Sequence, residues 1–113
     1  MALATARKEL QAAWNARREG LEGRSRVNAR RAVATVLAAH YIQTAKSLPT
    51  RNGFTLIELA SQDPLLPTEI RAKLETLCTR VNIDFSLGAG IDLLEISTNL
   101  VGYFTGGNID SIT

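Results

Sequence analysis

The chain has 113 residues, of which 45% are hydrophobic and 21% are charged. This composition fits one globular domain and excludes an intrinsically disordered chain. One cysteine, Cys78, excludes an internal disulfide and a cysteine zinc site, and one histidine, His40, leaves no histidine cluster for a metal. Aromatic residues make up only 5%, which argues against a base-stacking surface. We therefore expect no enzyme, no catalytic residues, no metal and no cofactor.

The net charge of +2 conceals two halves of opposite charge. Residues 1–51 contain ten basic and three acidic residues, a net charge of +7, whereas residues 52–113 contain three basic and eight acidic residues, a net charge of −5. Such asymmetry favours a partner that is a polyanion on the basic side. The alternative is a solvated basic helix face, or a basic half that docks on its own acidic half.

The basic half predicts two helices. The first covers 3–20, where Gly20 and Gly23 end it. The second covers 25–47, with Ser25 as its N-cap and Leu48-Pro49 after its end. Apolar residues recur at three- and four-residue spacing in both, as expected for helices that bury one face. The predicted apolar positions are Leu3, Ala6, Leu10, Ala13, Trp14 and Leu21 in the first helix, and Val33, Val36, Leu37, Tyr41 and Thr44 in the second.

The acidic half, 54–104, also predicts helices. A turn at Asn52-Gly53 precedes a short apolar helix over 54–60, and a longer helix begins with Thr68 as its cap and runs to about residue 82. A last helix covers 91–104, after a possible extended segment at 83–87 and a glycine turn at 88–90. The fold class is therefore all-α, a compact bundle of four to five helices forming a single domain over 1–104, with a flexible tail over 105–113. The predicted apolar positions are Ile70, Leu74, Leu77, Cys78 and Val81 in the longer helix, and Leu93, Ile96, Leu100, Tyr103 and Phe104 in the last.

Three residues that often carry chemistry fit better as packing residues. His40 lies beside Ala39 and Tyr41 in the second helix, Trp14 has core spacing, and Cys78 follows the apolar stripe of its helix. A cysteine in such a stripe acts as a small hydrophobic residue.

An arginine cluster is the candidate binding site. Two arginines lie at the end of the first helix, and four more fall within eight residues at the start of the second. A tight turn between the helices would bring both groups together. Positive charge at a helix N-terminus opposes the helix dipole, which favours an anion that offsets it. Such a patch binds the phosphates of a nucleic-acid backbone without reading sequence. The candidate nucleic-acid-binding residues are Arg17, Arg18, Arg24, Arg26, Arg30 and Arg31.

Two stretches resemble the small, helical-bundle subunits of CRISPR effector complexes. The sequence from Tyr41 to Pro49, followed by Asn52-Gly53, resembles the helix end of Cmr-type small subunits, and Leu66-Pro67-Thr68-Glu69-Ile70-Arg71 resembles the helix start of the Csm type. The resemblance covers about half of the chain. It implies a non-catalytic subunit of a ribonucleoprotein complex for antiviral defence, stacked in several copies, that holds the guide–target duplex or a displaced strand of RNA or DNA. The acidic second half departs from this pattern and suits contact with a protein neighbour.

Two other functions remain open. The chain fits a structural component of a viral or other protein assembly, whose oppositely charged halves stack head to tail. It also fits a helical adaptor that binds one partner protein. No apolar run approaches the roughly 20 residues of a membrane span, and no signal peptide is visible, so we expect a cytoplasmic protein without membrane contact.

Overall fold

Five α-helices form the part of the chain that the structure describes. The structure is a computed structural model that describes residues 2–45, 47–78 and 92–106. The helices are α1 (Ala2–Arg18), α2 (Glu22–Ala45), α3 (Gly53–Ser61), α4 (Thr68–Cys78) and α5 (Leu93–Phe104). Within these residues there is no β-strand, and the radius of gyration of 13.4 Å matches the ~13 Å of a compact domain of this length. The expected all-α bundle is confirmed.

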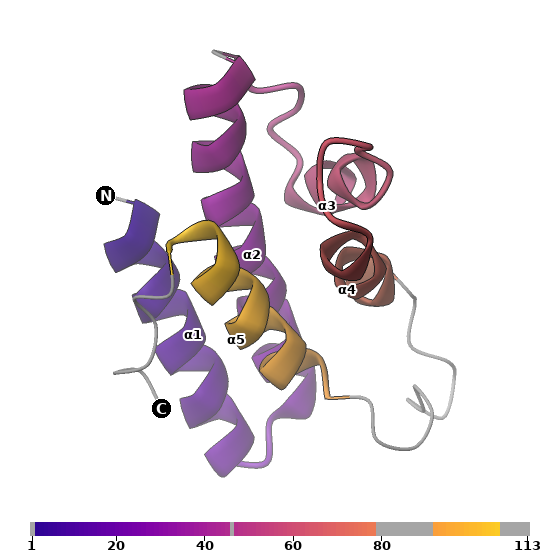
Figure 1. The fold of residues 1–113 in the computed structure, drawn as a ribbon. Helices are drawn as coiled ribbons and strands as arrows, with labels where there is room; N and C mark the ends of the chain where they lie inside the picture. Colours follow the sequence, from indigo (N-terminus) through magenta and orange to yellow (C-terminus); the bar gives the residue numbers. More distant parts are fainter. Residues whose placement is uncertain (1, 46, 79–91, 107–113) are drawn as a thin grey trace.

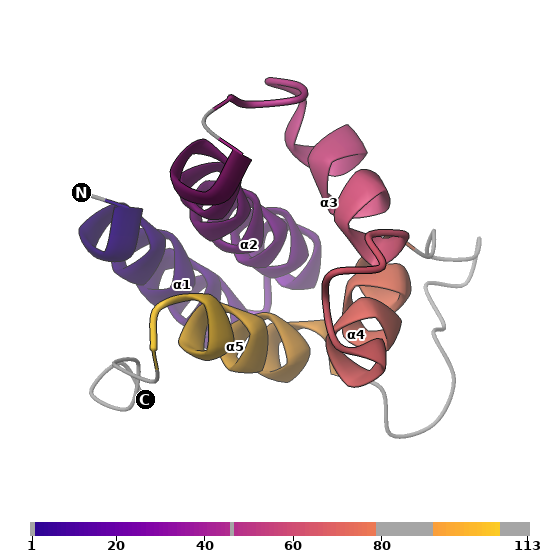
Figure 2. The same ribbon diagram turned by 45° about the horizontal axis from the view of Figure 1, so that its top comes forward.

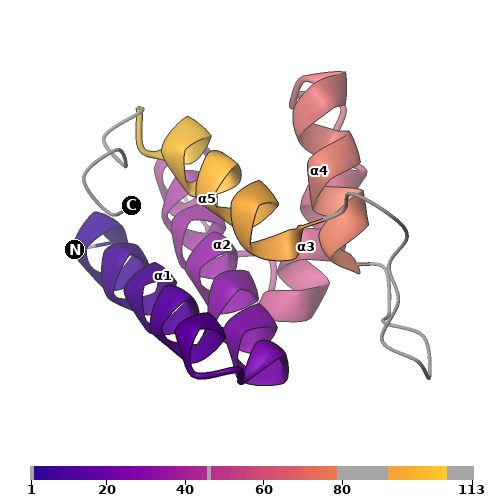
Figure 3. The ribbon, with the colours of Figure 1, turned by 90° about the horizontal axis from the view of Figure 1, so that it is seen from below.

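Helix α2 is the centre of the bundle. It runs antiparallel to α1, and α5 packs across both of them (Figure 1). Helices α3 and α4 pack on each other, and α3 also packs on α2 (Figure 2). Seen from below, α1, α2 and α5 form one group of helices with α3 and α4 beside it (Figure 3). Every other helix therefore depends on α2 or on a neighbour of α2 for its position.

The core is built mainly from aliphatic side chains of all five helices. Their burial provides most of the folding free energy, because apolar area removed from water contributes about 25 cal/mol per Å². Small residues on α1 and α2 let these two long helices pack closely. The largest fully buried apolar side chains are Leu10, Val33, Leu37, Ile57, Leu74, Leu77, Leu94, Leu100 and Val101.

A glycine turn joins α1 to α2. Gly20 has φ +79°, the amide of Leu21 donates to Ala16 O (2.8 Å), and the amide of Gly20 donates to Arg17 O (3.0 Å). This pair of bonds is a Schellman motif, in which glycine suits the left-handed residue. Because the turn is so short, α2 begins at Glu22, and the amide of Ser25 donates to Leu21 O inside the helix (2.9 Å).

The prediction that Ser25 is the N-cap of the second helix is therefore wrong. Ser25 is fully buried, one turn inside α2. The earlier start of α2 also changes which residues lie near the positive end of the helix dipole. Glu22 and Arg24 lie in the first turn, whereas Arg30 lies two turns further on, beyond the reach of that positive end.

The starts of the other helices also differ from prediction. Asn52 is not a free turn residue but the N-cap of α3, since its side chain accepts from the amide of Thr55 (2.9 Å). At α4, Thr68 is the first helical residue and not the cap, because the amide of Arg71 donates to Pro67 O (3.0 Å). The last helix starts later than expected, at Leu93, with Asp92 as its N-cap.

Individual core predictions are mostly confirmed. Trp14, Tyr41, Cys78 and Phe104 pack against the core as partly buried side chains. Leu21, in contrast, is 41% exposed because it belongs to the turn. Thr44 and Tyr103, which were also predicted on apolar faces, are exposed as well.

The segments predicted at 79–91 and most of the tail, 107–113, lie outside the described residues. The tail was predicted to begin at residue 105, but Thr105 is the C-cap of α5.

Candidate nucleic-acid interface

The six candidate arginines do not form one patch, because the bundle gives them different surroundings. Arg17 is neutralised by two carboxylates. Arg30 is half-buried against the end of α4. The others, Arg18, Arg24, Arg26 and Arg31, extend from α1 or α2 with no carboxylate within ion-pair distance among the described residues.

Arg17 connects three helix ends. Its Nη1 and Nη2 donate to the two carboxylate oxygens of Asp92 at 2.9 Å each, and its Nε donates to Glu22 at 2.9 Å. These hydrogen bonds to Asp92, and secondly to Glu22, raise the pKa of Arg17, while the bond from Arg17 lowers the pKa of Asp92. Since Asp92 also caps α5, Arg17 holds the ends of α1, α2 and α5 together. Its charge is not available to a phosphate.

Arg30 is a cation with no carboxylate partner among the described residues. Its Nε donates to Leu77 O (3.0 Å), one residue before α4 ends at Cys78, and a cation is favourable at a helix C-terminus. Burial, and secondly the nearby charge of Arg26, lower the pKa of Arg30. The remaining N–H groups of its guanidinium have no acceptor among the described residues, so the positive charge of Arg30 is only partly compensated.

The exposed face of α2 carries the most accessible arginines. Arg24 and Arg31 are both exposed, and seven residues separate them, which is two helical turns or ~10 Å along the axis. Val27 lies between them on the same face and is 47% exposed. Arg26 and Arg30 share another side of the helix, roughly 130° around its axis from that face. About two turns of α2 therefore carry four arginines.

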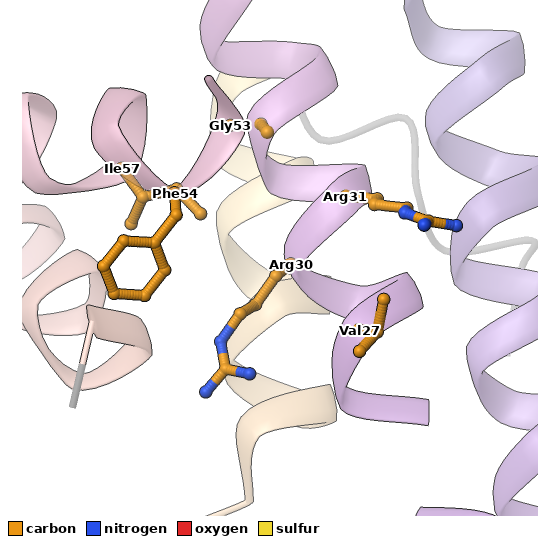
Figure 4. Close-up of a pocket in the computed structure, with 7 residues that line it drawn as sticks. Val27, Arg30, Arg31, Gly53, Phe54 and Ile57 are labelled. Carbon is orange, nitrogen blue, oxygen red and sulfur yellow. The ribbon is translucent and has the colours of Figure 1, made fainter. Parts of the chain in front are cut away.

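An apolar pocket lies beside these arginines, between α2 and α3. Its volume is about 190 Å³, and it is lined by Val27, Arg30, Arg31, Ala34, Gly53, Phe54 and Ile57. Figure 4 shows the Arg30 guanidinium between the ring of Phe54 and the side chain of Val27, whereas Arg31 extends away from Phe54.

Gly53 positions this wall of the pocket. A Cβ at Gly53 would lie 3.1 Å from the Cβ of Ala34, so glycine lets the start of α3 approach α2 closely.

Phe54 was not expected at this interface. In the sequence it is the first apolar residue of a short helix, and nothing local distinguishes it from a core residue. It is 37% exposed because it lines the open pocket between α2 and α3 and is not covered by another helix. The signal that was available is the glycine at 53, which marks a close approach of two backbones.

The described residues hold no group of three or more potential metal ligands among His, Cys, Asp and Glu. Burial, followed by the charge of Glu58, raises the pKa of the Cys78 thiol to about 11, which makes it a poor nucleophile near neutral pH. None of the described helices combines the length and the apolar character that crossing a bilayer requires. Comparisons with known proteins found no matching family, no similar curated protein and no similar solved structure.

Proposed function

We propose that this protein is a non-catalytic, nucleic-acid-binding subunit of a larger complex, in the manner of the CRISPR effector small subunits that its sequence resembles. The basic face of α2 contacts the phosphate backbone, and Arg18 at the end of α1 extends it. We name Arg24, Arg26, Arg30 and Arg31 the α2 arginines, and assign them the phosphate contacts. Arg17 is not part of this set.

One observation carries the proposal. The four α2 arginines lack a carboxylate partner among the described residues, although carboxylates elsewhere in the same bundle neutralise Arg17. Uncompensated arginines that lie close together on one helix repel each other, as Arg26 and Arg30 do. An anionic partner relieves this repulsion, and a guanidinium suits phosphate because it can donate two parallel hydrogen bonds.

A protein neighbour suits the opposite charge of the second half. Helices α3, α4 and α5 expose Glu58, Glu69, Glu75 and Glu95. We propose that this half contacts another subunit, either a different protein or a further copy of the same chain.

The salt dependence of binding tests the phosphate contacts. Affinity for a short RNA or DNA is measured by fluorescence anisotropy between 50 and 300 mM salt, for the wild type and for Arg31→Gln and Arg24→Gln. The logarithm of the binding constant falls linearly with the logarithm of the salt concentration, and each lost phosphate contact makes this negative slope shallower by about 0.7–0.9. Lys8→Gln is the matched control, since Lys8 is an exposed cation on α1 outside the α2 arginines. Equal slopes for all four proteins would refute the assignment.

Self-assembly without nucleic acid is the main alternative, because it uses the same charges. Light scattering after size exclusion, at low and high salt and after nuclease treatment, separates the two. Oligomers that need no nucleic acid and dissociate in high salt favour a structural component of an assembly.

A further inference from the structure

The pocket between α2 and α3 combines two features that a phosphate-binding surface does not require. Its lining is mostly apolar, from Val27, Ala34, Phe54 and Ile57. One ring, that of Phe54, is accessible to solvent, with the Arg30 guanidinium beside it (Figure 4). A backbone contact needs only the cations, so the open aromatic ring calls for a ligand with both a flat apolar group and an anionic group.

A nucleotide has these two groups at a fixed separation. A base stacks on an aromatic ring with little dependence on its identity, because every base has a π face. The adjoining phosphate is then close to Arg30, whose guanidinium lies at the ring, whereas the guanidinium of Arg31 extends away from Phe54. In a duplex the base faces are covered by their neighbours, so a duplex cannot use the ring.

We propose that the pocket between α2 and α3 binds one unstacked base of a single-stranded nucleic acid, with Phe54 as the stacking residue and Arg30 as the contact to a flanking phosphate. This inference rests on the proposed function and adds to it a preference for single strands. The low aromatic content of the chain does not oppose it, since one ring is enough for one base.

Comparing base-bearing with abasic strands separates the contribution of the base to affinity from that of the backbone. The probes are 12-nucleotide DNA and RNA strands with thymine or uracil bases, abasic strands of the same length, and the corresponding duplex. Phe54→Ala is expected to weaken binding of the base-bearing strand roughly 5- to 100-fold and to leave the abasic strand and the salt slope unchanged. Phe54→Trp keeps the ring and is expected to keep the affinity, and Phe54→Leu keeps apolar packing but loses the ring.

Two controls protect the result against a folding defect. Leu59→Ala removes a comparably exposed apolar side chain from the same helix, at a position outside the pocket. Thermal unfolding followed by circular dichroism reports whether each variant is folded, and Phe54→Leu replaces Phe54→Ala if the latter is not.

The possible outcomes separate this inference from the proposed function. A loss of affinity with Phe54→Leu but not with Leu59→Ala, confined to the base-bearing strand, supports the stacking site. Equal binding of wild-type protein to base-bearing and abasic strands, or equal affinity of the Phe54 variants and wild type, overturns it while the phosphate contacts stand. Failure of every strand to bind overturns both.

Discussion

The Arg17–Asp92 pair provides the sharpest test of how the bundle assigns its arginines. Arg17→Gln keeps most of the side-chain stem and removes the charge. Asp92→Asn keeps an oxygen for the cap of α5, because asparagine is as good an N-cap as aspartate. The two changes and their combination form a double-mutant cycle that isolates the ion pair from the helix cap.

The structure sets the size of the effect. The pair is bidentate, with both N–O distances at 2.9 Å, and the two side chains retain 29% and 35% of their exposure. Exposed ion pairs contribute about 0.2–1 kcal/mol, and hydrogen bonds to charged groups contribute about 1.5–3 kcal/mol. Partial exposure places the Arg17–Asp92 coupling at ~1–2 kcal/mol. Asp92→Ala, which also removes the cap, is expected to cost about 1 kcal/mol more.

Urea unfolding at low and at high salt measures this coupling. We expect it to decrease in high salt, because the pair is partly exposed. A coupling below about 0.3 kcal/mol, within the usual error of additivity, would show that the pair does not join the helices. The same Arg17→Gln protein is expected to show the wild-type salt dependence of nucleic-acid binding. A slope made as shallow as that of Arg31→Gln would show that Arg17 also contacts phosphate.

The pH dependence follows from the direction of the Asp92 shift. Arg17 lowers the pKa of Asp92 in the folded state below its ordinary value of 3.8. The stabilisation is therefore present above that ordinary value and is lost as the pH falls through the lowered folded pKa. Asp92→Asn is expected to flatten the decline of stability below about pH 5, which urea unfolding at several pH values measures. A decline as steep as that of the wild type contradicts the shift.

Three further predictions concern single residues. Gly20→Ala is expected to cost about 1 kcal/mol in urea unfolding, because a residue with a Cβ is strained at positive φ, and an unchanged stability contradicts the Schellman turn. Cys78 in the folded protein is expected to react with iodoacetamide on the order of 100-fold more slowly at pH 8 than in urea, because of its raised pKa; equal rates contradict its burial. Tyr41→Phe is expected to cost about 1 kcal/mol, since the Tyr41 hydroxyl donates to Asp63 at 2.7 Å, and Asp63→Asn is expected to reduce that cost. A Tyr41→Phe protein as stable as the wild type contradicts a contribution of this bond.

The sequence predicted the helices well where apolar residues recur at helical spacing. In α4, Ile70, Leu74 and Leu77 are all buried as expected, because the core selects one face of each helix. The sequence predicted the first and last residues of the helices less well. Ser25 has the chemistry of an N-cap, but the Schellman turn at Gly20 starts α2 three residues earlier, and a hydroxyl's preference for the cap is smaller than the energy of burying a helix face.

The candidate site shows where the sequence stopped being informative. Arg17 and Arg31 have the same side chain and lie in similarly basic surroundings along the chain. Only the fold brings Asp92, 75 residues away, to Arg17, and leaves Arg31 without a carboxylate among the described residues. Local sequence cannot show this difference, because it depends on the crossing of α1 and α5.

The sequence by itself determined the all-α class, the apolar faces and the polarity between a basic and an acidic half. These properties depend on composition and on spacing along the chain, which are local. The tertiary structure alone decided which arginines are neutralised, and it placed Phe54 beside Arg30 at the edge of a pocket. Ion pairs and pockets form between residues that are distant along the chain, so they exist only after the helices have packed.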